Sequence, residues 1–265
     1  MSTQQTSNSK RSPSSEFDYR LRLYRPGDSK EVQALYLNAM IWQPHAPLMS
    51  FLKLVATTTI AKVIYLTSIL GAAIWVRHPT LGQVISLVAG GAALLQLGFA
   101  FRMVWSVVMQ NLKEDLADVA EHYMLVPVNK VGSDNESKKE LELQASGPRG
   151  FWIVEATHRA TGKTELAGCG GLDIIQKGDT SEAEFRRMVV SSRHTRRGIA
   201  AMVIGAIVAH AKSHNLPSIY LSTSSLQSPA IKLYKKHGWV EERRQEMPTF
   251  GTNASIVYMR LHLKE

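Results

Sequence analysis

Cysteine is nearly absent from this 265-residue sequence, in which Cys169 stands alone. One cysteine cannot form an internal disulfide or supply a cysteine-built zinc site, so we expect a fold held by packing and no bound metal. Acidic residues are also scarce, since 22 Asp and Glu face 31 Lys and Arg and leave a net charge of +9. This balance suits an anionic partner. The basic residues are scattered and form no recognised binding module, so we expect no nucleic acid.

Apolar residues are lacking at the start of the chain. Residues 1–16 are polar and rich in serine, and they contain no apolar core of the kind found in a signal peptide. We expect this segment to be a disordered tail.

Charge is absent from Leu81 to Phe101, a run that as a helix would be about 32 Å long and could cross a bilayer. A preceding apolar segment, Leu54 to Val76, carries one charge, Lys62, whose side chain can reach toward the interface. Pro79 lies between the two and ends the first helix. We predict that residues 51–108 form a helical hairpin, with helices over 54–76 and 81–101, that spans or re-enters the membrane.

Other features of the two runs bear on this prediction. Small residues would let the helices pack closely: Gly90, Gly91, Ala92, Ala93 and Gly98, with Gly71, Ala72 and Ala73 opposite them. Basic residues are slightly more frequent at the open end of the hairpin than at its tip, which predicts that both ends face the cytosol. The alternative is a pair of buried helices in a soluble protein.

Regular structure is expected on both sides of the hairpin. A strand and a helix in residues 17–50 cannot form a core alone, so they must pack with residues 109–265 as two parts of one domain. Downstream, periodicity and turn residues predict helices over 111–126, 199–213 and 228–237 and strands over 151–156, 164–175, 181–192, 216–225 and 253–263.

A basic, glycine-containing turn precedes the helix that starts at Ile199. Its six residues, Thr195-Arg196-Arg197-Gly198-Ile199-Ala200, resemble the Gln/Arg-x-x-Gly-x-Gly/Ala motif of the GNAT superfamily (GCN5-related N-acetyltransferases). Gly198 and Ala200 match the motif. Thr195 replaces Gln or Arg, and Arg196 stands where many members have another glycine.

A second stretch, Gln227 to Trp239, resembles the family's Asn-x-x-Ala-x-x-Leu-Tyr-x-x-x-Gly-Phe motif. It keeps Ala230, Leu233, Tyr234 and Gly238, with Gln227 in place of Asn. Together with the apolar hairpin, these motifs look like the membrane-bound branch, which includes endoplasmic-reticulum enzymes that acetylate cysteine S-conjugates or aspartate.

The resemblance implies a fold and a co-substrate. The expected fold is α/β (α+β): a GNAT fold with a mixed central sheet flanked by helices and the hairpin inserted. The expected co-substrate is acetyl-CoA. Main-chain N–H groups of residues 195–200 at a helix start can hold its pyrophosphate, and nearby arginines add positive charge: Arg193, Arg196 and Arg197. In the family the preceding strand splays from its neighbour, which implies that Val189 and Val190 expose main-chain groups to the pantetheine arm.

The expected reaction needs a general acid and a general base. The family match implies that Tyr234 protonates the departing thiolate. For the base, Glu184 leads and Glu182 follows, because Glu184 shares a strand face with Arg186, Met188 and Val190 if the strand alternates regularly. His194 and Asp173 are further candidates for the base, and Cys169 is a candidate for carrying a covalent acetyl group.

The function expected from these observations is a membrane-anchored N-acetyltransferase that moves acetyl from acetyl-CoA to a primary amine of a small molecule or amino-acid derivative, by direct transfer in a ternary complex. The resemblance places it in the endoplasmic-reticulum membrane with its catalytic domain in the cytosol. Alternatives are a lysine acetyltransferase acting on membrane or secretory-pathway proteins and a non-catalytic CoA-binding membrane protein.

Overall fold

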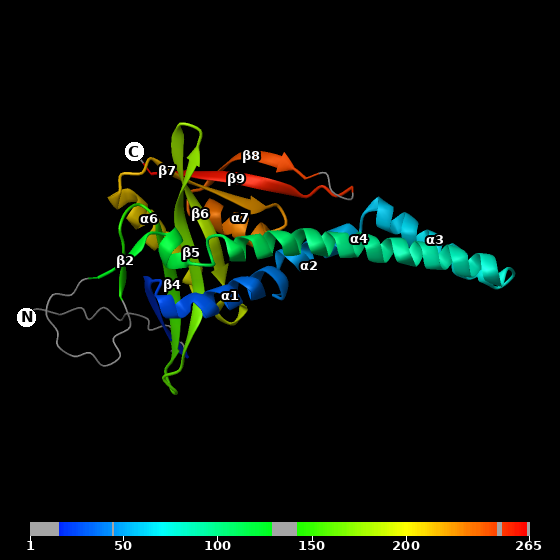
Figure 1. Ribbon diagram of the computed structural model, residues 1–265, viewed down its shortest axis with the longest axis horizontal. Helices are drawn as coiled ribbons and strands as arrows, with labels where there is room; N and C mark the ends of the chain where they lie inside the picture. The colour runs from blue at the N-terminus through cyan, green and yellow to red at the C-terminus, as the bar shows by residue number, and fades with distance from the viewer. Residues whose placement is uncertain (1–15, 44, 129–141, 248–250, 264–265) are drawn as a thin grey trace, which may run out of the picture.

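The computed structural model describes residues 16–43, 45–128, 142–247 and 251–263. A seven-stranded sheet with the order β1-β4-β5-β6-β7-β9-β8 organises these residues. Most of its strands are labelled in Figure 1. Its strands are β1 (Phe17–Leu23), β4 (Gly150–His158), β5 (Thr164–Lys177), β6 (Thr180–Val190), β7 (Ser218–Ser224), β8 (Val240–Glu246) and β9 (Ser255–His262). Neighbouring strands are antiparallel except β6 and β7, which run parallel, so the sheet is mixed. A separate two-stranded sheet pairs β2 (Leu125–Pro127) with β3 (Leu143–Ala145).

Helices cover both faces of the large sheet. On one face, α6 (Ile199–Ser213) and α7 (Ser228–Lys236) pack into a core that includes Val203, Ile207 and Tyr234. On the other, α1 (Ser29–Ile41), the short α5 (Val119–His122) and the end of α4 (Pro79–Lys113) pack around Tyr36, Val108 and Tyr123. Each helix buries an apolar face against the sheet, and this burial drives the layered arrangement.

The segment before the hairpin is part of the same sheet as the segment after it. Strand β1 pairs antiparallel with β4 from Phe17 opposite His158 to Leu23 opposite Trp152. Helix α1 then packs against β5 and β6. Residues far apart in sequence therefore build one core, and the hairpin leaves it and returns.

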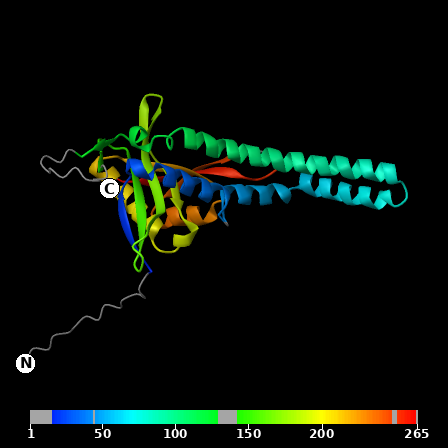
Figure 2. The ribbon, with the colours of Figure 1, turned by 60° about the horizontal axis from the view of Figure 1, so that its bottom comes forward.

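The hairpin is formed by α3 (Thr59–Trp75) and α4 and projects from the domain in both views (Figure 1, Figure 2). Its two helices touch closely where side chains are missing: a Cβ on Gly82 would lie 2.3 Å from the main-chain nitrogen of Trp75, and one on Gly71 would lie 2.6 Å from Ser86 Oγ. Gly90, Gly91 and Gly98 have open space instead. The expectation that these three glycines bring the helices together is wrong, and among the glycines predicted for this role only Gly71 lies at the contact.

The first apolar segment is not one helix. Helix α2 (Pro47–Ala56) and α3 meet at a 57° bend over Thr57 and Thr58. The Thr58 hydroxyl accepts a hydrogen bond from the Ala61 N–H and so caps the start of α3, while Phe51 and Val55 bury α2 in the domain. Core packing of α2 thus redirects the chain before the hairpin begins.

Helix α4 is longer than the predicted 81–101 and is long and apolar enough to cross a membrane, with 17% of its most apolar window buried. The bent pair α2 and α3 passes the same test only if it is counted as one span. Large apolar side chains are exposed all along α3 and α4, including Leu66, Ile69, Leu87, Leu94 and Leu95.

Two other predictions differ from the structure. The helix predicted over 111–126 is wrong, because α4 ends at Lys113, α5 has only four residues and β2 follows. The carboxylate of Asp115 is buried and accepts hydrogen bonds from Arg187 and Tyr123, which holds this segment in a turn. Strand β8 was not predicted, since its charged sequence shows no apolar alternation and it becomes a strand by pairing with β9.

Candidate functional site

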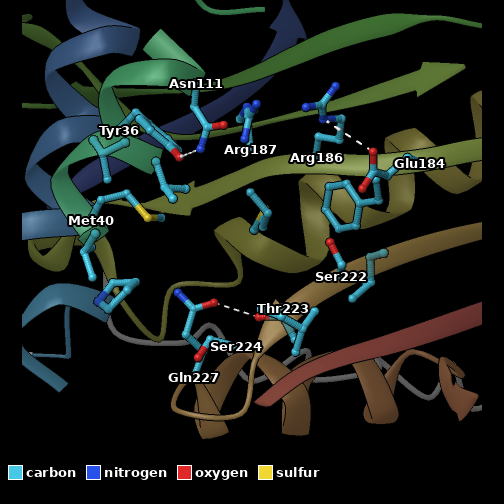
Figure 3. Close-up of a pocket in the computed structure, with 18 of the residues that line it drawn as sticks. Tyr36, Met40, Asn111, Glu184, Arg186, Arg187, Ser222, Thr223, Ser224 and Gln227 are labelled. Carbon is cyan, nitrogen blue, oxygen red and sulfur yellow. Dashed lines mark hydrogen bonds and ion pairs between the residues drawn. The ribbon is translucent and has the colours of Figure 1, made fainter. Parts of the chain in front are cut away.

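The parallel strands β6 and β7 separate, and a cavity opens between them. They pair only at Ala183 with Ile219 and at Glu184 with Tyr220. Beyond that point a cavity of about 420 Å³ begins, drawn in Figure 3. It is lined by β6, β7, α7 and the ends of α1, α2 and α4, including Arg187, Ser222, Thr223, Gln227 and Tyr234. The sequence alone could not show this splay.

The turn before α6 has the geometry of an anion site. Gly198 has φ 81° and caps the helix in the left-handed conformation that favours glycine. The first helical bond runs from the Met202 N–H to the Gly198 carbonyl, which leaves the N–H groups of Ile199 and Ala200 without a helical acceptor. Arg196 also has a positive φ, 61°, at the place where many family members have glycine.

The arginines of this turn differ in their surroundings. Arg193 is 68% exposed and forms an ion pair with Glu165 at 2.6 Å between Nη1 and Oε2. Arg196 and Arg197 are exposed. The Thr195 hydroxyl donates to the Ser192 carbonyl and so closes the turn locally. The turn therefore presents helix-start N–H groups and positive charge to the surface, as phosphate binding requires.

A bulge in β6 changes which side chains share a face. The pairing with β5 shifts register between Cys169 and Gly171, and Arg187 has φ 55°. Val189 is buried in the core beneath α1, whereas Val190 packs on the α6 side. The expectation that Glu184 and Val190 share one face is therefore wrong, because the extra residue at the bulge reverses the alternation.

Glu184 lines the cavity and is 8% exposed. Burial raises the pKa of its carboxyl group above the ordinary value, although the neighbouring guanidinium of Arg186, 3.5 Å away, opposes the shift. A carboxylate that is poorly solvated holds a proton more readily, which is the property a base needs to act at neutral pH.

Tyr234 lines the same cavity from α7 and is buried against the rings of Phe185 and Trp239. Burial raises the pKa of its phenol, so the hydroxyl stays protonated. No residue within the described ranges makes a hydrogen bond to this hydroxyl. Gln227 precedes α7 at the cavity edge, and its Oε1 accepts a hydrogen bond from Thr223.

The other candidate bases lie outside the cavity lining and are already engaged. His194 is buried between Tyr19 and Glu165, 3.2 and 3.0 Å from them. Arg149, Arg186 and His122 surround Asp173, and hydrogen bonds from His122 and Arg186 lower the pKa of its carboxyl group despite burial. Neither residue is arranged to take a proton from a substrate in the cavity.

Glu182 and Cys169 are also poorly placed. Glu182 pairs with Lys177 and Arg260, and the hydrogen bond from Lys177 lowers its pKa. Cys169 is fully buried, and burial raises the pKa of its thiol to about 12. A thiol in this state is a poor nucleophile.

Sequence reasoning missed a buried polar network behind the cavity. Asp115 accepts hydrogen bonds from Nε and Nη2 of Arg187 at 2.7 to 2.9 Å and from the Tyr123 hydroxyl at 2.8 Å. Asn111 donates to the Tyr36 hydroxyl at 2.7 Å, as Figure 3 shows. Asp115 lies in an apparently amphipathic stretch with no motif, so no sequence signal pointed to it.

Comparison with known proteins agrees with this geometry. Residues 114–239 match the sequence model of the "Acetyltransferase (GNAT) family", a span that includes the turn at Gly198 and Tyr234. This span therefore carries a GNAT acetyltransferase domain, and the resemblance seen in the motifs is confirmed.

Individual proteins similar to this chain include members of one branch of the family. The chain is 23% identical to N-acetyltransferase family 8 member 7 of Mus musculus over 83% of this chain and 84% of that protein. It is 33% identical over 36% of its length to the uncharacterized N-acetyltransferase YsnE of Bacillus subtilis, of which it spans 61%. A GNAT-family acetyltransferase from Staphylococcus aureus superposes with a TM-score of 0.49 at 12% identity, over 93% of this chain and 100% of that one. The family 8 relatives match the branch that the motifs resemble.

Proposed function

We propose that this protein is a membrane-anchored N-acetyltransferase that transfers acetyl from acetyl-CoA directly to a primary amine of a small molecule or amino-acid derivative. The proposal rests on how the glycine turn, the splayed strands and two side chains are arranged. The glycine turn at the head of α6 lies at the end of a strand that splays from its neighbour, and Glu184 and Tyr234 line the resulting cavity.

Acetyl-CoA fits the residues present. The N–H groups of Ile199 and Ala200 point out of the start of α6 and can hold the pyrophosphate, with Arg193, Arg196 and Arg197 nearby. Val189 and Val190 lie at the end of β6 beyond its last pairing with β7, and in this proposal their main-chain groups contact the pantetheine arm. The Val190 carbonyl now accepts a hydrogen bond from Gln43 Nε2 at 3.4 Å, which the arm would replace. Gln227, at the cavity edge, contacts the same arm in this proposal.

The transfer needs a base and an acid, and the thioester supplies an activated acetyl group. Glu184 takes a proton from the ammonium group of the acceptor, either directly or through water. The amine nitrogen then forms a bond to the acetyl carbon as the carbon–sulfur bond breaks, and the nitrogen loses a second proton to solvent to give the neutral amide. Glu184 releases the proton it took to solvent. Tyr234 gives its proton to the departing sulfur and recovers one from solvent. The products are an N-acetyl amide and CoA.

The size of the cavity supports a small acceptor. Its volume of about 420 Å³ lies within the range of small-molecule sites, about 300 to 1,000 Å³. Residues of α1, α2 and α4 line the side opposite the β6–β7 split. These features favour a small amine over a lysine presented by a folded protein.

The hairpin supports membrane anchoring. Helix α3 has 17 residues and is about 26 Å long, near the minimum for a bilayer span. Most of its exposed side chains, like those of the facing part of α4, are apolar, and the exposed Lys62 carries a charge. In this proposal residues 51–108 hold residues 17–50 and 109–265 at the cytosolic surface of the endoplasmic-reticulum membrane.

One experiment tests the activity. The full chain, purified in detergent, is incubated with acetyl-CoA and a panel of amines, amino acids and lysine peptides, and CoA release and product mass are followed. Amide products from small amines are expected. Binding of acetyl-CoA without any product would favour a non-catalytic CoA-binding protein, and preference for peptides would favour lysine acetylation. Carbonate extraction of membranes should leave the protein in the pellet, and release into the supernatant would refute anchoring.

A further inference from the structure

Helix α4 belongs both to the hairpin and to the wall of the cavity. Its first part packs against α3, and its last turns carry Val104, Val107, Val108 and Asn111 into the cavity lining. No break separates the two parts. Val108 is buried, but Val107 lines the cavity and is 55% exposed, so the cavity reaches the surface along this helix.

The wall of the cavity that α4 forms is mainly apolar, whereas the end of the cavity that contains Glu184 is polar. Val104 and Val107 line the cavity together with Met40 and Pro47. Glu184 and the hydroxyl-bearing residues of β7 line the part of the cavity in which we propose that acetyl transfer takes place. This wall therefore offers carbon surface to a bound molecule.

The polar groups that line the cavity beside this wall are hydrogen-bonded to one another or to Asp115. The guanidinium of Arg187 is held by Asp115, and the amide of Asn111 donates to the Tyr36 hydroxyl. These partners would have to be given up before either group could bind a polar substituent of the acceptor, which would cost free energy.

Aromatic side chains mark the level at which α4 leaves the hairpin. Phe101 and Trp105 stack on the outside of the helix with ring centroids 5.7 Å apart, and both are exposed. Aromatic rings of this kind concentrate where the bilayer meets water. Val104 and Val107 lie within one turn of Trp105 on the same helix, so in the proposed membrane-anchored arrangement the cavity would open at the bilayer surface.

We infer that the acceptor is an amphiphilic primary amine, whose amino group meets Glu184 and Tyr234 while its alkyl or aryl substituent lies along Val104 and Val107 after entering from the bilayer surface. This inference rests on the proposed function and narrows its substrate class. Each methylene buried against this wall should raise kcat/KM by up to about fourfold, because binding then releases ordered water from apolar surface.

The test compares straight-chain amines from ethylamine to octylamine. The full chain in phospholipid nanodiscs receives saturating acetyl-CoA, and kcat/KM is measured for each amine and for a lysine-containing peptide. We expect kcat/KM to rise at least about tenfold from ethylamine to octylamine. A flat or falling series, or a peptide that exceeds every alkylamine, overturns the inference while leaving N-acetylation itself intact. Absence of any acetylated product overturns the proposed function instead.

A matched pair of variants locates the effect. Val107→Asp places a charge where the substituent should lie, and it should lower the octylamine-to-ethylamine ratio of kcat/KM at least about fivefold, because an alkyl chain packed against the carboxylate would remove water from the charge, which costs free energy. Ser106→Asp introduces the same charge on the adjacent exposed position, which does not line the cavity, and should keep the wild-type ratio. Equal ratios in the two variants would refute the placement along α4.

Discussion

Tyr234→Phe removes one oxygen atom from the cavity and leaves the packing of the ring unchanged. The ring keeps its contacts with Phe185 and Trp239, whose centroids lie 6.0 and 6.1 Å away. The hydroxyl makes no hydrogen bond to any described residue, so its loss breaks no contact that holds the fold. We therefore expect the free energy of unfolding to change by less than about 0.5 kcal/mol.

The effect on the rate should be large. A positioned general acid contributes about 10²- to 10⁴-fold, which corresponds to about 3 to 5 kcal/mol of the activation barrier. Because burial raises the pKa of the phenol, Tyr234 carries its proton at neutral pH and can give it to sulfur. Phenylalanine cannot. We expect kcat to fall at least about 100-fold, with the dissociation constant of acetyl-CoA nearly unchanged.

The assay follows CoA release at saturating concentrations of both substrates, with calorimetry for acetyl-CoA binding and thermal unfolding for stability. Tyr258→Phe is the matched control, since this half-buried tyrosine on β9 lies outside the cavity lining and its hydroxyl donates to Gln245 Oε1. A Tyr234→Phe enzyme with kcat near that of the control would refute the acid role, and a large loss of acetyl-CoA affinity would show that the hydroxyl serves binding.

Other changes test the turn, the base, the buried network and the hairpin. Gly198→Ala forces a side chain to adopt φ 81°, costing about 1 to 2 kcal/mol, so calorimetry should show acetyl-CoA binding weakened about tenfold. Wild-type kcat/KM should rise with pH as Glu184 loses its proton, through a pKa above the ordinary 4.5, and Glu184→Gln should abolish that rise. Asp115→Ala leaves the Arg187 guanidinium buried without its partner and should lower the free energy of unfolding by about 3 to 5 kcal/mol in urea titrations. Gly82→Ala should lower the melting temperature in micelles because its Cβ would collide with the main chain of α3, whereas Gly90→Ala, which has open space, should not.

Local patterns in the sequence sufficed for much of the sheet and for the loop. The strands predicted over 151–156 and 164–175 appear as β4 and β5, and the helix predicted after Gly198 appears as α6, because alternation and turn residues act over a few neighbours. The family match confirmed the motif around Gly198.

Prediction failed where distant contacts decide the conformation. The stretch 111–126 has helical periodicity, yet Asp115 turns inward to meet Arg187, which lies 72 positions later. A regular strand was expected through Val190, yet the bulge at Arg187 reverses its faces. Neither partner is visible in a local window.

The sequence by itself determined the class of enzyme, the cationic glycine turn and the existence of two apolar runs, since each of these depends on residue types and short spacings. Only the tertiary structure decided that β6 and β7 part to form a cavity, that Glu184 and Tyr234 reach it while His194 and Asp173 do not, and that α4 joins the hairpin to its wall. These features depend on where segments from different parts of the chain meet, and that is set by the packing of the whole core.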